Sequence, residues 1–124
     1  MPQVLKERRN KMIFFKNTVS THSENTIYFE AFENDDLIGK CTLTLEEKYA
    51  HVSDVTYKNG ALYAAEGLLK SAFNYACLKN YYMGRCSAEG VDSLLERMGF
   101  YKKDGVYEND IPSILMGSCG SCNK

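Results

Sequence analysis

The sequence has no tryptophan and only two prolines among its 124 residues. It has no apolar run near the ~20 residues that a membrane-spanning helix needs. We also expect no secretory signal peptide, because no apolar stretch follows the charged N-terminal residues. The formal net charge of −1 provides no basic surface for nucleic acid or for an anionic membrane. These absences favour a protein that binds neither nucleic acid nor membrane.

The cysteines do not form a pattern typical of disulfide or zinc proteins. Their number is odd, and they stand at Cys41, Cys77, Cys86, Cys119 and Cys122. The first three lie in periodic segments, so we expect small buried hydrophobes, a reduced compartment and a cytoplasmic location. Cys119 and Cys122 form a Cys-x-x-Cys pair, but the sequence has no second pair that would complete a zinc site. We therefore expect no metal and interpret the pair as part of an unstructured polar tail with two reactive thiols; an intermolecular disulfide or a metal shared across a dimer is the alternative.

The composition is that of one ordinary globular domain. Hydrophobic residues make up 44% of the chain and charged residues 25%, and the length suits a single core. We find no repeat and no interdomain linker. We therefore expect one domain over residues 1–116, followed by a short Cys-containing tail at 117–124.

The first half of the sequence alternates in the manner of strands. We predict strands over residues 11–19, 26–33 and 37–45, with turn residues at 34–36. In the second of these strands, Ile27, Phe29 and Ala31 share one face. In the third, the odd-numbered positions from Leu37 to Leu45 share one face.

The second half predicts a strand, a long helix and another strand. A strand over 50–57 is followed by a break at 58–61 and a helix over 62–79. The apolar face of this helix is Leu62, Ala65, Leu69, Ala72, Phe73 and Ala76. A strand over 81–86 and a short helix follow, with Gly99 at a left-handed C-cap. Such a unit implies a right-handed parallel crossover. A turn at 103–105 and a final strand over 111–116 complete the prediction.

This order of elements, ending in Glu96-Arg97-Met98-Gly99-Phe100, resembles the GNAT family of acyl-CoA N-acyltransferases over residues 26–116. The family Val of the fourth strand corresponds to Val55, and its pyrophosphate loop to residues 60–65. The paired leucines of the following helix correspond to Leu68 and Leu69. The resemblance implies an α/β fold, with a mixed, twisted sheet of about six strands and helices on both faces.

The resemblance also implies an activity: acetyl transfer from acetyl-CoA to a primary amine on a small molecule or peptide. In this family a backbone N–H polarises the thioester carbonyl, which here implies groups near Val55 and Tyr57. The same comparison assigns cofactor contacts to Gly60, Ala61 and Ala65, at the N-terminus of the long helix.

An amine acceptor must lose a proton before it attacks, so a general base is useful. Asp54 and His51 lie on the strand that would border the acyl group, and histidine titrates in the useful range. Both residues are therefore candidate catalytic residues. The alternatives are that Asp54 caps the following turn and that His51 is an exposed residue at the start of its strand.

Two positions depart from the family pattern. Tyr63 stands where the loop has its first Gly, and Leu95 stands where the family has the Tyr credited with protonating the CoA thiolate. Tyr81, Tyr82 and Tyr101 are possible replacement acids. The departures favour an alternative function, a non-catalytic module that binds CoA or a protein partner.

The acceptor side also differs from that of typical relatives. The segment between the strands ending at Val19 and beginning at Thr26 is too short for the two helices that form one wall of the family's acceptor site. We therefore expect an open acceptor side, which a helix over 2–11 or a second subunit of a homodimer could complete.

Overall fold

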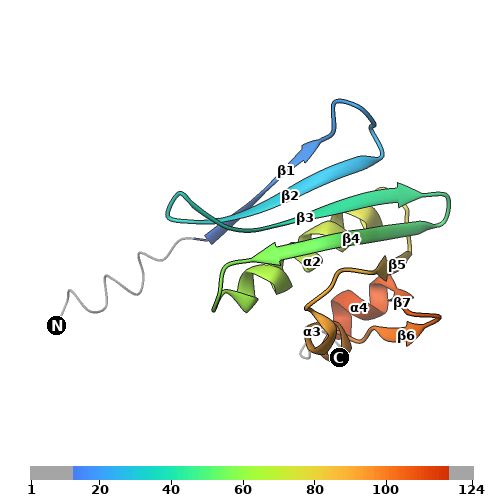
Figure 1. The fold of residues 1–124 in the computed structure, drawn as a ribbon. Helices are drawn as coiled ribbons and strands as arrows, with labels where there is room; N and C mark the ends of the chain where they lie inside the picture. Colours follow the sequence, from blue (N-terminus) through green and yellow to red (C-terminus); the bar gives the residue numbers. More distant parts are fainter. Residues whose placement is uncertain (1–12, 118–124) are drawn as a thin grey trace.

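The computed structural model describes residues 13–117, which form one seven-stranded sheet in the order β1-β2-β3-β4-β5-β7-β6 (Figure 1). The strands are β1 (Ile13–Val19), β2 (Thr26–Glu33), β3 (Asp36–Glu46), β4 (Tyr49–Tyr57), β5 (Met83–Cys86), β6 (Tyr101–Lys103) and β7 (Val106–Asp110). The helices are α2 (Leu62–Leu78), α3 (Asp92–Arg97) and α4 (Ile111–Gly117).

The predicted α/β class and mixed sheet are confirmed. Strands β4 and β5 pair in parallel through the α2 crossover, whereas the other neighbours are antiparallel. The sheet has one strand more than the predicted six. Residues 101–110 form a hairpin of two strands, and its turn at Asp104 and Gly105 has φ angles of 54° and 84°.

The predicted strand over 111–116 is wrong, because this segment is helix α4. The Asp110 carboxylate accepts a hydrogen bond from the Ser113 N–H at 3.0 Å, which is the geometry of a helix N-cap. Ile111 and Ile114, three positions apart, are then buried on the same side of the helix.

The predicted face of β3 holds from Gly39 to Leu45 and fails only at Leu37. Leu37 is exposed, whereas Ile38 is buried. The cause is a register shift opposite Ala31 and Phe32, where Ile38 is the extra residue of a bulge. A bulge reverses the alternation, so the side chains before it exchange faces.

The expected helices on both faces are not found among residues 13–117. A Cβ on Gly84 of β5 would meet Phe73 of α2 at 2.8 Å and Ile111 of α4 at 3.2 Å, so both helices lie on one face. Helix α3 joins them there, because Arg97 contacts Glu66 of α2 at 3.0 Å. The family's two additional helices have no room between β1 and β2.

The core prediction for α2 is largely confirmed. Ala65, Leu69, Ala72, Phe73 and Ala76 are fully buried, but Leu62 at the first turn is 40% exposed. Gly99 has φ of +106°, as expected for a left-handed C-cap. Cys41 and Cys86 are buried, and Cys77 is half-buried.

The face of β1–β4 opposite α2 is bare in the part of the chain that the structure describes. A tight loop joins β1 to β2, with the Ser20 N–H bonded to the Thr26 carbonyl at 2.8 Å. The possible helix over 2–11 and the pair Cys119 and Cys122 lie outside the described residues. No described helix is long and apolar enough to cross a membrane. Within residues 13–117 we find no cluster of metal-ligating side chains.

Candidate functional site

Strand β4 extends beyond its parallel neighbour β5 (Figure 1). The last residue pair between them is Val52 with Cys86, and Ser87 donates its N–H to the Val52 carbonyl at 3.0 Å. Beyond this bond the strands separate, so the second half of β4 has a neighbour only on the β3 side. We call this separation the β4–β5 gap; Val55 and Tyr57 lie on its β4 side.

The N–H groups of Val55 and Tyr57 point into the β4–β5 gap. Lys58 donates its N–H to the Ile38 carbonyl on β3 at 2.9 Å. Alternate residues of a strand direct their N–H groups to opposite sides. The N–H groups of Val55 and Tyr57 therefore point away from β3, toward the side on which β5 no longer pairs with β4. Such N–H groups can bind a carbonyl oxygen inserted beside the strand.

A bulge in β4 lies just before these residues. Thr42 pairs with Asp54 and Leu43 with Val52, so Ser53 is the extra residue. As a result Ser53 and Asp54 are both exposed. Asp54 lines a hollow of about 320 Å³ on the bare face, together with Glu30, Lys40 and Thr42.

The two predicted bases, His51 and Asp54, share the bare face of β4 but do not touch. Their partners on β3, Thr44 and Thr42, are two residues apart, which corresponds to about 7 Å along a strand. His51 Nε2 instead lies 2.8 Å from Ser87 Oγ. Burial lowers the pKa of His51 below its usual value, Glu46 opposes this effect, and Arg85 adds to it.

The predicted pyrophosphate loop leads directly into α2. Gly60 has φ of +86° and open space around it, which glycine tolerates without strain. No side chain caps the helix N-terminus at Ala61, and no acidic residue occupies its first turn. The backbone N–H groups there can therefore bind an anion. Ala61 and Ala65 are buried, so their side chains support the loop from the core.

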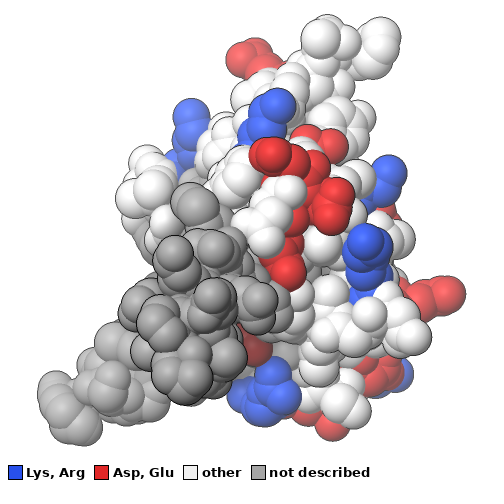
Figure 2. Space-filling view, turned by 90° about the vertical axis from the view of Figure 1, so that its left-hand side faces the viewer, with Lys and Arg blue, Asp and Glu red and all other residues white. Residues whose placement is uncertain are grey.

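Two carboxylates lie on one side of this loop. The Tyr63 hydroxyl donates to Glu33 Oε1 at 2.5 Å, and this bond raises the pKa of Tyr63. Glu33, Asp36 and Lys58 line one hollow together with Gly60 and the Tyr63 side chain. Figure 2 shows acidic side chains gathered on this end of the molecule. The two carboxylates beside the loop oppose the binding of a pyrophosphate, and Lys58 offsets only one of their two negative charges.

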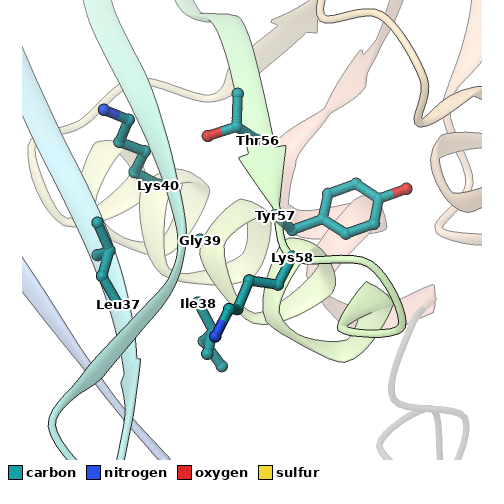
Figure 3. A pocket seen from close by; sticks show the side chains of 7 residues that line it. All are labelled: Leu37, Ile38, Gly39, Lys40, Thr56, Tyr57 and Lys58. Atoms are coloured by element: carbon teal, nitrogen blue, oxygen red, sulfur yellow. The ribbon is translucent and has the colours of Figure 1, made fainter.

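Tyr57 crosses the β4–β5 gap. Its side chain points away from Leu37 and Lys40 (Figure 3), and its hydroxyl donates to the Gly90 carbonyl at 3.4 Å. On the β3 side of Tyr57, Lys40 and Lys58 line a hollow of about 240 Å³. The side chain of Tyr57 must move if a ligand is to pass through the gap at this point.

The position of the family's acidic Tyr holds no proton donor. Leu95 is fully buried in the core. Tyr82 bonds to Asn80 at 3.1 Å, and Tyr101 lies on the β6–β7 hairpin, so neither is placed at the gap. Tyr107 was missed in the sequence; its hydroxyl donates to Glu96 at 2.8 Å, which raises its pKa to about 12. It therefore holds its proton tightly.

Ser87 was also missed, since nothing in the sequence distinguishes it from a loop serine after a strand. The parallel pairing of β4 and β5 places it beside His51, a residue 36 positions earlier. The nearest sequence signal is its position directly after the predicted strand.

Solved structures with this architecture are numerous. An N-acetyltransferase from Staphylococcus aureus has 16% identity, a TM-score of 0.64 and coverage of 82% of this chain and 99% of its own. The ribosomal-protein-S18-alanine N-acetyltransferase of Escherichia coli has 11% identity, a TM-score of 0.65 and coverage of 81% and 94%. A GNAT-family acetyltransferase, also from Staphylococcus aureus, has 14% identity, a TM-score of 0.61 and coverage of 70% and 68%.

The chain has the GNAT fold. No family model and no curated protein matches the sequence, so the likeness lies in the structure. In this chain the β4–β5 gap, the bulge of β4 and the loop before α2 lie along one path that follows β4.

Proposed function

We propose that this protein transfers an acetyl group from acetyl-CoA to a primary amine. The observation that carries the proposal is the β4–β5 gap, with the N–H groups of Val55 and Tyr57 directed into it. One of these two N–H groups can hydrogen-bond the thioester carbonyl and stabilise the negative charge that develops on its oxygen during attack, since groups two residues apart on a strand cannot share one oxygen. This stabilisation needs no particular side chain.

The chemistry is one displacement. The amine nitrogen attacks the thioester carbon, the carbonyl oxygen becomes an oxyanion, and the C–S bond then breaks. The products are an amide, the CoA thiolate and one proton. Leu95 offers no proton to the thiolate, so we propose that the rate depends mainly on positioning and on the backbone N–H groups.

The acceptor approaches over the bare face of the sheet. Helix α2 covers the opposite face, and Glu30 and Asp54 line a hollow on the bare one. Lys40 lines the same hollow and offsets one of the two carboxylates, so one net negative charge remains to attract an acceptor that arrives as an ammonium ion. The open face accommodates a peptide terminus as well as a small amine, and a second copy of the chain could complete its missing wall.

An alternative function is a non-catalytic module that binds CoA or a protein partner. The observation that favours it is the carboxylate pair Glu33 and Asp36 beside the pyrophosphate loop, together with the buried Leu95. A module would bind its ligand without any release of thiol.

The test measures thiol release from acetyl-CoA against a panel of polyamines, aminoglycosides and peptides. Release that depends on the acceptor supports the transferase and excludes the module. Asp54→Asn in the same assay tests Asp54 as the base. A general base contributes about 10²–10⁴-fold, so an unchanged rate in this variant would eliminate Asp54 from that role.

A further inference from the structure

His51 and Ser87 form a hydrogen-bonded pair at the point where the sheet opens. His51 lies on β4 and Ser87 follows β5, and their Nε2 and Oγ atoms are 2.8 Å apart. The backbone N–H of Ser87 donates to the Val52 carbonyl, the last bond between the two strands. The pair is therefore held in place by the parallel ladder, at the closed end of the β4–β5 gap.

The pair faces the side from which the acceptor arrives. Ala50 and Val52, on either side of His51, are fully buried against the helices. Because side chains alternate along a strand, His51 points to the opposite, bare face. Asp54 lies further along the same face, on the bulge. An amine that reaches the gap over this face passes beside Ser87.

The charged groups around His51 come from three elements. Glu46 from the end of β3 favours the imidazolium form, whereas Arg85 from β5 disfavours it. Arg85 is itself paired with Glu108 of β7 at 3.3 Å. Burial is the largest influence and lowers the pKa of His51. The imidazole is therefore neutral at pH 7 and able to accept a proton.

We propose that Ser87 and His51 form a proton relay that removes a proton from the attacking amine. This inference rests on the proposed transferase function. As the nitrogen–carbon bond forms, the amine proton passes to Ser87 Oγ and the Ser87 proton passes to His51 Nε2. The C–S bond then breaks and CoA leaves as the thiolate. His51 afterwards releases its proton to solvent, so every atom and charge is accounted for.

The test compares wild type with Ser87→Ala, Ser87→Thr, His51→Gln and the double variant Ser87→Ala/His51→Gln. Ser71→Ala, on the side of α2 that faces β1 and away from the β4–β5 gap, is the matched control. Thiol release from acetyl-CoA with the best amine gives kcat and KM across pH 5–9. Circular dichroism and thermal unfolding establish that each variant is folded.

We expect kcat to fall roughly 10²-fold in Ser87→Ala and in His51→Gln. The double variant should lose no more than either single variant, because the two groups act as one unit. Ser87→Thr, which keeps a hydroxyl, should retain most of the rate, and KM for acetyl-CoA should change little. Wild-type kcat should fall on the acidic side, with a midpoint below about pH 6.5, and His51→Gln should lack this fall.

Three results would overturn the relay. The first is a folded Ser87→Ala variant whose kcat, and whose fall in kcat at acidic pH, are the same as in wild type. The second is an acetyl group on Ser87, detected by mass spectrometry after incubation with acetyl-CoA alone, because Ser87 would then be a nucleophile. The third is no acceptor-dependent thiol release by wild type, which overturns the proposed function as well. The first result, obtained while wild type releases thiol, overturns the relay alone.

Discussion

Glu33 and Asp36 are the residues that most directly oppose the binding of an anionic cofactor. Both line the hollow beside the pyrophosphate loop. The Tyr63 hydroxyl holds the Glu33 carboxylate there by a hydrogen bond. Removing either negative charge should therefore strengthen the binding of acetyl-CoA, since like charges disfavour it.

We expect Glu33→Gln and Asp36→Asn each to increase acetyl-CoA affinity, by roughly two- to fivefold at low ionic strength. Gln keeps an acceptor for Tyr63, so the loop should keep its shape. Calorimetry measures the effect, with Glu47→Gln in the β3–β4 turn as control. Equal affinities in all of these proteins would show that the phosphates bind elsewhere.

Single residues were the hardest features to predict from the sequence. Leu95 and Val55 could be placed because their neighbours form a periodic pattern. The hydrogen-bond partner of His51 could not be predicted, because it depends on the register in which β5 pairs with β4. The reversal at Leu37 and Ile38 depends on a bulge, and no residue type in that segment marks it.

Helix α2 packs against the buried face of the strands that carry the candidate site. Leu69 and Phe73 have no exposed surface, whereas Lys70 forms a half-exposed ion pair with Glu66 at 3.1 Å. We expect Leu69→Ala or Phe73→Ala to lower the free energy of unfolding by about 2–5 kcal/mol. Lys70→Ala should change it by at most about 0.5 kcal/mol. Chemical denaturation measures all three, and equal losses would refute the assignment of the helix face.

Helix α4 depends on its cap. Hydrogen bonds from Ser113 lower the pKa of Asp110 in the folded protein. A lowered pKa means that the carboxylate contributes stability above its unfolded value, about 3.9. That contribution is lost as pH falls through the lower folded value. Asp110→Asn should therefore remove part of the loss of stability in acid.

Unfolding followed from pH 7 to pH 2 measures this effect, with Asp104→Asn in the β6–β7 turn as control. The same acid dependence in Asp110→Asn and wild type would contradict the cap.

This helix also shows why the segment 111–116 was predicted wrongly. Isoleucine is a residue type that favours strands, so Ile111 and Ile114 predicted one. The Asp110 carboxylate caps the segment and stabilises a helix instead.

At the scale of the whole molecule, the order of elements was predictable because each long element has its own hydrophobic period. The parallel pairing of β4 and β5 followed from the long helix between them. The bare face of the sheet could also be expected, because the connection between β1 and β2 is too short for two helices. The placement of α2, α3 and α4 together on the other face could not, because it depends on how each helix packs against the sheet.

The central claim is that the acyl thioester binds in the β4–β5 gap, against the N–H groups of Val55 and Tyr57. The most direct measurement is a titration of isotope-labelled protein with acetyl-CoA, in which the backbone amides are followed by nuclear magnetic resonance. We expect the amides of Val55 and Tyr57 to shift most, with Ser87 and Gly60 affected next. The amide of Lys58, bonded to Ile38 on the other side of β4, is the internal control. Binding that shifts amides elsewhere while leaving Val55 and Tyr57 unmoved, or no shift at millimolar acetyl-CoA, would contradict the account.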